Sequence, residues 1–202
     1  MIERQTHEAL LANAATIKAL RSFRIEPEYD WDVRDAAAVI GAPFNRYLKR
    51  QPADRSNCGI VQIAASHMRY FDDLPYFGQW EQTNLLRAEF GDRVCEYPDV
   101  HGCGEWVQTH VLIKWIAEEV LKLGRGNKVI LVGHPHHVCR VAILAQHYGL
   151  NPIVVPACAH IAYDHNWCRR GVQLWCTWPV FYIPWEYASR QMLIRMIQQG
   201  KI

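Results

Sequence analysis

A continuous apolar run at residues 129–132 (VILV), followed by a polar loop and then by helical spacing, constrains the fold of this chain most strongly. The run ends at Gly133 and is typical of a strand that is buried on both faces. From Val138 onward, apolar residues recur every three or four positions until Gly149, and residues 152–156 form another short apolar run. This order predicts a right-handed βαβ unit, which belongs in a parallel sheet.

The rest of the chain alternates in the same way between short apolar runs and segments with helical spacing. The runs that we interpret as strands are residues 35–41, 59–66 (GIVQIAAS), 93–97 and 180–183, and the predicted helices are an N-terminal helix, residues 79–90, a long helix that Glu105 opens, and residues 185–199. Such alternation predicts an α/β fold, a three-layer sandwich with a mainly parallel sheet. We expect residues 1–34 to form a helix and connector and residues 35–202 the α/β domain, in one compact unit.

Composition narrows the class of protein. The chain has 202 residues, of which 50% are hydrophobic and 21% charged, with a formal net charge of +2. These values fit one soluble globular domain and lack the basic excess of a protein that binds nucleic acid. No window approaches the roughly 18 apolar residues that span a membrane, and the start lacks the pattern of a secretory signal. A cytoplasmic protein without nucleic-acid or membrane partners is the expectation.

Cysteine and aromatic residues are numerous. The seven cysteines include no C-x-x-C pair, which argues against a structural zinc cluster and a thioredoxin-like motif, and we expect most of them to be buried thiols. Many of the eight tryptophans and nine tyrosines follow residue 160. They fit a packed core, a homo-oligomer formed through an aromatic surface, or a wall for a planar ligand.

Four loops should meet where the predicted strands end. In a parallel sheet the carboxyl ends of the strands share one edge, and ligands bind in the crevice there. We therefore expect one pocket, with two walls that different loops supply. Its first wall should carry Glu105, His134, His136 and Arg140, and its second wall Gly41, Ser66 and His67.

Residues 133–140 carry most of the chemistry. Pro135 precedes a helix, and Arg140 lies one turn into it, where a guanidinium can hold a carboxylate or phosphate or can form a salt bridge. His134 and His136 are candidates for proton shuttles or hydrogen-bond donors. A metal site is the alternative for these loops. It would recruit His67, His134, His136 and Cys103, because the local histidines do not share one helical face.

The segment V-H-G-C-G-E before the long helix is a second candidate. Gly104 suits a backbone that approaches a ligand closely, and the helix amino end can receive an anion. Glu105 either stabilises the helix dipole or faces the ligand. Cys103 is a nucleophile candidate, because the dipole would stabilise its thiolate, or a packed thiol.

Three blocks together resemble the SanA/ElyC/YdcF family. They are DAAAVIGAP at residues 35–43, CEYPDVHGCGEW at 95–106 and KVILVGHPHHVCRVAILAQHYGL at 128–150. The resemblance implies a Rossmann-like domain over roughly residues 35–200, and one member of that family is associated with S-adenosylmethionine. It also implies a pocket built from Gly41, Glu96, Gly104, Glu105, Pro135 and Arg140. The chain departs from the family at Ser66 and His67, where many members have glycines, and at Trp106, where an asparagine is usual.

The residues and the resemblance favour a small-molecule enzyme with transferase- or hydrolase-type chemistry. Its ligand would be anionic and nucleotide-like, such as S-adenosylmethionine or a phosphate-bearing molecule. Catalysis would fall to Glu105, His134 and His136, and ligand binding to Gly41, Ser66, His67, Glu96, Cys103, Gly104, Pro135 and Arg140. A non-catalytic binding or sensing module and a metal-dependent enzyme are the alternatives.

Overall fold

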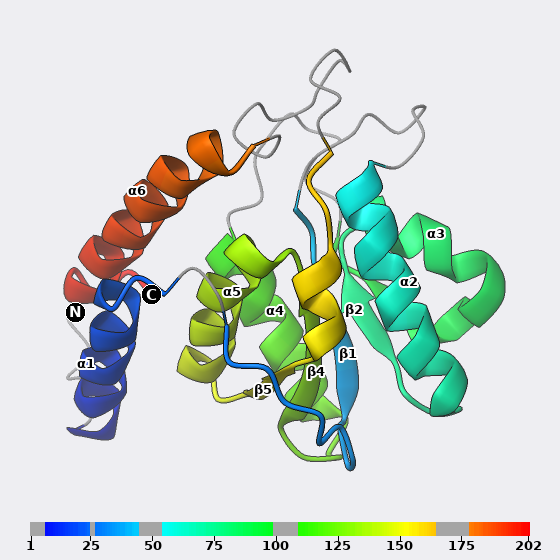
Figure 1. Ribbon diagram of the computed structural model, residues 1–202. Helices are drawn as coiled ribbons and strands as arrows, with labels where there is room; N and C mark the ends of the chain where they lie inside the picture. The colour runs from blue at the N-terminus through cyan, green and yellow to red at the C-terminus, as the bar shows by residue number, and fades with distance from the viewer. Residues whose placement is uncertain (1–6, 25–26, 45–53, 99–108, 165–177) are drawn as a thin grey trace.

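The computed structural model describes residues 7–24, 27–44, 54–98, 109–164 and 178–202 (Figure 1). Five parallel strands form one sheet: β1 (Ala38–Ala42), β2 (Tyr76–Gly78), β3 (Val94–Glu96), β4 (Lys128–Gly133) and β5 (Asn151–Val154). The helices are α1 (His7–Arg21), α2 (Arg55–Tyr70), α3 (Trp80–Phe90), α4 (Thr109–Lys122), α5 (Pro135–His147) and α6 (Pro179–Gln198). Two 3-10 turns complete the described elements: η1 (Gly91–Arg93) and η3 (Pro156–His160).

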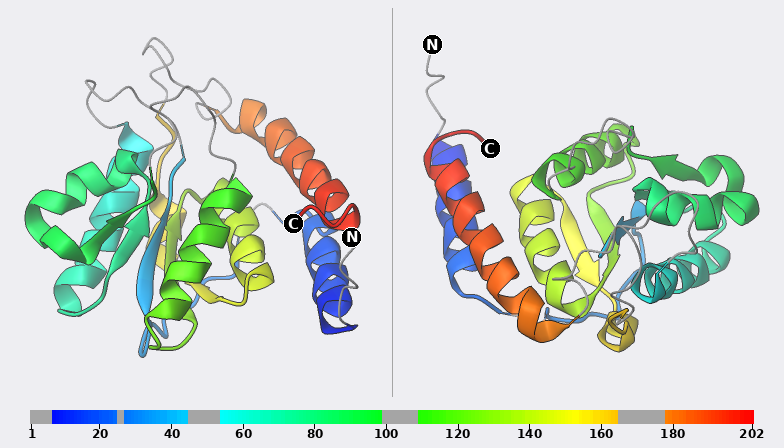
Figure 2. Two further views of the ribbon diagram at one scale, coloured as in Figure 1. Left: turned by 180° about the vertical axis from the view of Figure 1, so that it is seen from behind. Right: turned by 90° about the horizontal axis from the view of Figure 1, so that it is seen from above.

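The strand order is β3-β2-β1-β4-β5, which is the order of a Rossmann-like sheet. The chain first winds from β1 outward to β3 and then crosses back, through α4, to β4 on the other side of β1. As a result α2 and α3 cover one face of the sheet, and α4 and α5 cover the other (Figure 2). The predicted three-layer α/β sandwich with a parallel sheet is confirmed.

The βαβ unit is confirmed as well. β4 lies inside the sheet and pairs in parallel with both β1 and β5. Pro135 occupies the first turn of α5, where its missing N–H leaves no hydrogen bond unmade. Gly149 ends that helix with φ of 86°, a conformation that glycine adopts without strain.

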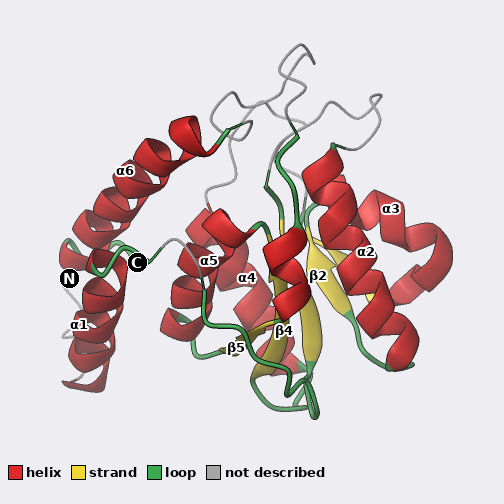
Figure 3. Ribbon diagram, viewed as in Figure 1, coloured by secondary structure: helices red, strands yellow, loops and turns green. Residues whose placement is uncertain are grey.

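The predicted strand at residues 59–66 is wrong, because this segment lies within helix α2 (Figure 3). Its buried residues step by three and four positions, as in Ile60, Ala64 and Met68, and this is a helical period. Asp54 caps the helix by accepting the backbone N–H of Asn57 at 3.0 Å. Gln62 interrupts the apolar run and is exposed, as the solvent side of a helix allows.

The predicted strand at residues 180–183 is wrong too, because these residues form the first turn of α6. Buried Tyr182, Glu186 and Arg190 follow one another at helical spacing on the inner side of this helix. Two of these residues are charged, so an apolar pattern does not reveal the face that they form. Strand β2 was not predicted, for a different reason. Its three residues are too few to show the two-residue period of a strand.

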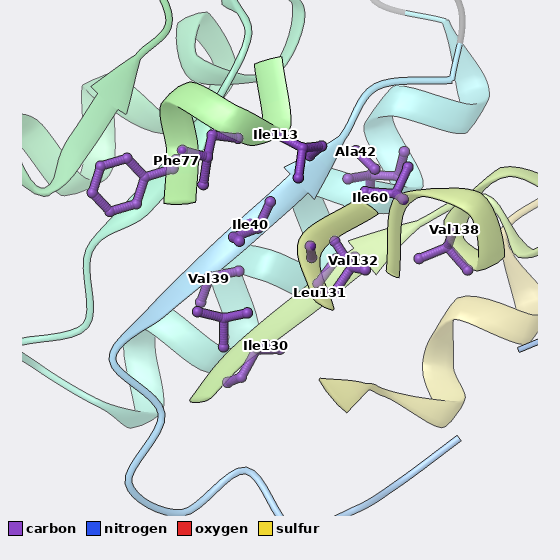
Figure 4. Packing of buried hydrophobic residues seen from close by; sticks show 14 of the residues in the cluster. Val39, Ile40, Ala42, Ile60, Phe77, Ile113, Ile130, Leu131, Val132 and Val138 are labelled. Atoms are coloured by element: carbon purple, nitrogen blue, oxygen red, sulfur yellow. The ribbon is translucent and has the colours of Figure 1, made fainter. Parts of the chain in front are cut away.

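The hydrophobic core lies along β1 and β4. Every residue of β1 is buried, and Val129 to Val132 in β4 are fully inaccessible to solvent. Ile60 and Ile113 pack against these strands from opposite helical layers (Figure 4). The centre of the sheet is therefore closed on both faces, as the continuous apolar runs require.

Helices α1 and α6 lie together beside α5, at one side of the molecule (Figures 1 and 2). Thr16 of α1 hydrogen-bonds to His147 Nδ1 at 3.1 Å, and Tyr29 in the connector forms a parallel bridge with Val154. The N-terminal segment thus packs onto the α/β body. Within the described ranges, no helix is both long and apolar enough to cross a membrane.

We predict that Leu131→Ala lowers the free energy of unfolding by about 2–5 kcal/mol, because it leaves a cavity in the centre of the sheet. The side chain of Leu131 is completely buried. Urea unfolding followed by circular dichroism measures the change. Leu121→Ala on the exposed side of α4 is the matched control and should change stability by less than about 0.5 kcal/mol. Equal losses in the two variants would contradict the assignment of Leu131 to the core.

Candidate functional site

The strand order reverses between β1 and β4, and aromatic and histidine side chains gather where these two strands end. We call Phe44, His134, His136 and Tyr163 the switch-point cluster. Phe44 follows β1, and its ring stacks on the ring of His134, which follows β4, with centroids 3.8 Å apart and an interplanar angle of 10°. Tyr163 meets His134 edge-on at 4.2 Å and Phe44 at 5.4 Å. Sheets of this topology bind ligands at such a switch point.

His134 is held in one neutral tautomer. It is the N-cap of α5, and its Nδ1 accepts the backbone N–H of His136 at 3.4 Å. Burial, together with the nearby His136, lowers the pKa of His134 to about 3. Since Nδ1 accepts and the ring is neutral, Nε2 carries the proton and is a hydrogen-bond donor. Nε2 is buried, and no described residue accepts its hydrogen bond.

His136 is half-buried and contacts Tyr163 directly. Its Nδ1 lies 2.5 Å from the Tyr163 hydroxyl oxygen, a short hydrogen bond between two groups that can each donate and accept. This pair lies beside His134, with the two imidazole centroids 5.5 Å apart. The cluster thus combines a fixed donor with a pair able to move a proton.

A buried ion cluster adjoins these residues and joins α5 to α6. Glu186 is 2% exposed, and both of its carboxylate oxygens accept hydrogen bonds. Arg140 Nε donates to Oε2 at 2.8 Å, and Arg190 Nε donates to Oε1 at the same distance. The Arg190 guanidinium also lies 4.9 Å from the centroid of Phe23. Two buried guanidinium groups therefore share one carboxylate.

His137 is neutral within this cluster. Arg140 Nη2 lies 3.1 Å from His137 Nδ1, and because a guanidinium can only donate, Nδ1 accepts. Burial and the charge of Arg140 hold the pKa of His137 well below its ordinary value. The hydroxyl oxygen of Tyr182 lies 2.9 Å from both His137 Nδ1 and Glu186 Oε2. With one proton, this hydroxyl can donate a hydrogen bond to only one of the two atoms at a time.

The expectation that Arg140 is free to clamp an anion is wrong for the described structure. Its side chain is 8% exposed, and it is engaged by Glu186, with a further hydrogen bond to Thr109 Oγ1 at 3.4 Å. Arg140 does form a salt bridge, which was the alternative prediction, but the pair with Glu186 is buried and does not lie on the surface. The partner carboxylate is 46 residues away in the sequence, within the predicted helix at residues 185–199.

Beyond β1, a chain of buried hydrogen bonds fixes the other side of the switch point. The Tyr76 hydroxyl donates to Gln82 Oε1 at 2.6 Å, and Gln82 Nε2 donates to Asn57 Oδ1 at 3.0 Å. A Cβ at Gly41 would stand 1.8 Å from the Tyr76 hydroxyl oxygen. This packing accounts for the glycine that we had assigned to ligand binding.

The amino end of α2 is occupied by carboxylates of the chain itself. Asp54 caps the helix, and Asp164 Oδ2 accepts the backbone N–H of Arg55 at 3.0 Å. Burial is the main cause that raises the pKa of Asp54, and the charge of Asp164 adds to it. By contrast, the first turn of α5 contains no acidic residue, and its cap is the neutral His134. Of these two helices, α5 offers the amino end with an unneutralised dipole.

Ser66 and His67 do not border this site. They lie near the end of α2, which begins at the carboxyl edge of the sheet and runs away from it. At about 1.5 Å per residue, Ser66 lies about 17 Å along the helix from Arg55. The expected second wall of Ser66 and His67 is therefore wrong, because it rested on a strand that is a helix.

Glu96 lies at the carboxyl edge but toward its end. β3 is three strands from β4, or about 14 Å at the usual strand spacing. The Glu96 carboxylate accepts a short hydrogen bond from Thr83 and one from Arg87 at 3.3 Å. Cys103, Gly104 and Glu105 lie outside the described residues. The structure thus brings together His134, Pro135 and His136, and it leaves Glu96 apart.

Of the residues proposed for a metal, His67 is at the far end of α2, away from His134 and His136, and Cys103 lies outside the described residues. Among the residues described, no group of three or more His, Cys, Asp or Glu side chains is arranged to hold a metal ion. The side chains of Cys139 and Cys158 are buried, and those of Cys58 and Cys95 are half-buried.

A cavity of about 600 Å³ lies at the opposite, amino edge of the sheet. Its lining includes Asp32 and Arg34, which pair with each other at 2.9 Å, and Asp73 and Arg125, which pair at the same distance. Its charged groups are thus largely paired with one another. Strand topology places ligand chemistry at the other edge, where the switch-point cluster lies.

Sequence reasoning missed five residues of this region: Phe44, Tyr163, Tyr182, Glu186 and Arg190. Phe44 lies three residues after the end of the first predicted strand, and that position is the signal available for it. Comparisons with protein-family models, with curated proteins and with solved structures gave no match. The site is therefore defined by its own geometry.

We predict that Arg140→Lys lowers the free energy of unfolding by about 1.5–3 kcal/mol, because an ammonium cannot replace the planar fork that meets both Glu186 and His137. Denaturant unfolding measures the loss. Arg69→Lys is the matched control, because Arg69 forms a two-point pair with Glu89 on the surface and should lose no more than about 1 kcal/mol. An unchanged stability of the Arg140 variant would contradict the buried cluster.

We also predict that stability falls as the pH drops from about 7 to 5. The pKa of His134 is about 3 in the folded protein against an ordinary 6.5, and that of His137 is lowered as well. Below about pH 6.5 the unfolded chain therefore binds more protons than the folded protein. The free energy of unfolding is unaffected by these histidines above that pH, and below it declines by up to about 1.4 kcal/mol per pH unit for each histidine.

Urea unfolding at several pH values measures this slope, and His134→Asn should flatten it. Asp54 acts in the opposite direction at lower pH, because its pKa is raised and its protonated form favours the folded state. The difference between the profiles of the unsubstituted protein and His134→Asn isolates the contribution of His134, because His67, His110 and His147 also have lowered pKa values and add to the common slope. A flat profile between about pH 5 and 7 in the unsubstituted protein would refute the neutral, buried state of His134 and His137.

Proposed function

We propose that this protein is a small-molecule enzyme that binds an anionic, nucleotide-like ligand at the carboxyl edge, between β1 and β4. The observation that carries the proposal is the buried Nε2–H of His134, a donor for which the described residues supply no acceptor. A buried donor is costly unless it meets an acceptor, by about 1–3 kcal/mol. An oxygen of a phosphate or carboxylate is an acceptor of the right kind.

The electrostatics of the two neighbouring helices support an anion at α5. The amino end of α2 already holds Asp54 and Asp164, and the amino end of α5 holds no acid in its first turn. Backbone N–H groups and the helix dipole at α5 would then attract negative charge together with His134. Phosphate-bearing molecules and S-adenosylmethionine, whose carboxylate is the anionic group, both belong to this class.

For the chemical step we assign the proton transfer to His136 and not to His134. A group with a pKa of about 3 is a poor base near neutral pH, so His134 serves as a neutral donor. His136 and the Tyr163 hydroxyl, 2.5 Å apart, form a pair that can move a proton to or from a bound molecule. Transferase or hydrolase chemistry fits such a pair.

A non-catalytic binding or sensing module is the second candidate. The low pKa of His134 favours it, since the best-defined group of the cluster is equipped to bind and not to exchange protons. Both candidates share the ligand and its position. They differ in whether substitution of the His136–Tyr163 pair abolishes turnover.

We predict that His134→Asn weakens ligand binding by about ten- to more than a hundredfold, the equivalent of one hydrogen bond to a charged group. Asparagine keeps the capping of α5 but removes the Nε2–H. Isothermal titration with ATP, ADP, S-adenosylmethionine and inorganic phosphate measures the affinities. His160→Asn, at an exposed histidine in η3, is the matched control and should bind as the unsubstituted protein does.

Two results would overturn the proposal. One is that none of the four probes binds with a dissociation constant below about 1 mM, and the other is that His134→Asn binds them unchanged. Where a probe binds, Tyr163→Phe separates the candidates. A fall in turnover with unchanged affinity supports the enzyme, and the absence of any product from the unsubstituted protein supports the binding module.

A further inference from the structure

The outer side of α6 carries an apolar stripe. We define the stripe as Trp178, Phe181, Trp185, Ala188 and Met192; Ala188 is exposed, and the four larger side chains are 44%, 56%, 46% and 46% exposed. Its members follow one another at intervals of three and four residues, which is the spacing of a single helical face. In Figures 1 and 2, α6 lies at the periphery beside α1, and α5 lies between α6 and the sheet.

The first half of α6 is inverted relative to an ordinary surface helix. Its inner face buries Tyr182, Glu186 and Arg190, and its outer face exposes aromatic rings to solvent. A surface helix normally buries its apolar side and exposes its charges. The exposed rings therefore do not belong to the hydrophobic core, because the ion cluster already occupies the inner face of the helix.

The area of the stripe suits the core of a protein interface. Aromatic side chains carry about 150–250 Å² each, so the three half-exposed rings, together with Met192, present roughly 300–500 Å² of apolar surface. This reaches the size of the largest patch on a typical monomer, which is often functional. It also supplies the apolar centre of an interface of about 800 Å² per partner.

The charge pattern identifies the occupant. Between Trp178 and Met192 the acidic and basic residues of α6 are Glu186 and Arg190, and both are buried. A membrane surface would call for lysine or arginine beside the rings, and this face has none in that stretch. A second copy of the chain provides a face that is equally aromatic and that is uncharged up to Arg195, which follows Met192 by three residues.

We propose that the outer face of α6 is the interface of a homodimer in which two α6 helices pack antiparallel about a two-fold axis. When Trp185 of one copy lies opposite Ala188 of the other, Phe181 lies opposite Met192 and Trp178 opposite Arg195. The large Trp185 then meets the small Ala188, as close helix packing requires. An arginine also meets an aromatic ring, which it can approach face-on.

This interface would stabilise the helix that supports the candidate site. The inner face of α6 supplies Glu186 to Arg140 and places the Tyr182 hydroxyl beside His137. A symmetric contact on the outer face would hold α6 against α5 in both copies. The inference concerns the assembly of the chain and stands whether or not the proposed ligand is correct.

Sedimentation equilibrium of the full chain over a wide concentration range tests the proposal. We expect the unsubstituted protein to reach the mass of a dimer. Trp185→Glu should raise the dimer dissociation constant at least about tenfold, because a tryptophan at the centre of an interface is a typical hot spot. Phe181→Glu is a second disruptive variant. Val111→Glu is the matched control, since this side chain on α4 is 40% exposed, and the dimer should persist.

Ala188→Trp distinguishes a specific interface from a merely adhesive surface. It makes the stripe more apolar but fills the space opposite Trp185, so the proposed dimer should weaken. Circular dichroism and thermal melting confirm that each variant is folded. A monomer at all concentrations, or stronger association of Ala188→Trp, would overturn the proposal. So would sedimentation of the unsubstituted protein with phosphatidylcholine–phosphatidylserine vesicles when Trp185→Glu abolishes it.

Discussion

The parallel pairing of β1 with β4 is the constraint on which the rest of the structure depends. Five consecutive residue pairs, from Ala38 with Val129 to Ala42 with Gly133, form this ladder in a fully buried environment. Buried backbone groups must be paired, so the two strands cannot separate without exposing or orphaning them. Because the chain leaves β1 toward α2 and leaves β4 toward α5, on opposite faces of the sheet, the connections that follow the two strands diverge. The crevice that holds the switch-point cluster is a consequence of this pairing.

The ion cluster around Glu186 governs how the C-terminal helix joins that sheet. Two guanidinium groups and one carboxylate are buried together, an arrangement that contributes less to stability than apolar packing would but is strongly destabilised when one member is removed. Its excess positive charge also acts on its surroundings. Arg140 and Arg190 both contribute to the lowered pKa of His137. The cluster therefore attaches α6 and keeps a neighbouring histidine neutral.

Sequence reasoning predicted the parts of the fold that one local pattern determines. The VILV run, Pro135 and Gly149 each act within a few residues, and β4, α5 and their boundary follow from them. It failed where a long-range partner decides the outcome. The role of Arg140 depends on Glu186, and the requirement for Gly41 depends on the Tyr76 hydroxyl, which reaches over it from β2. The short apolar run in α2 was compatible with a strand as well as with a helix. The wrong choice of a strand placed Ser66 and His67 at the carboxyl edge of the sheet, whereas they lie near the other edge.

The two faces of α6 connect these observations. From its own sequence, α6 would be expected to pack its aromatic stripe against the protein body and to leave Glu186 and Arg190 in water, because burying a charged group costs several kcal/mol. The structure does the opposite in the first half of the helix, since Arg140 on α5 supplies a buried partner for Glu186. Once the charged face is turned inward, helical geometry places Phe181 and Trp185 on the outer side. The exposed apolar surface is thus a direct consequence of the buried ion cluster, and covering it would lower the free energy of the same arrangement that positions His137.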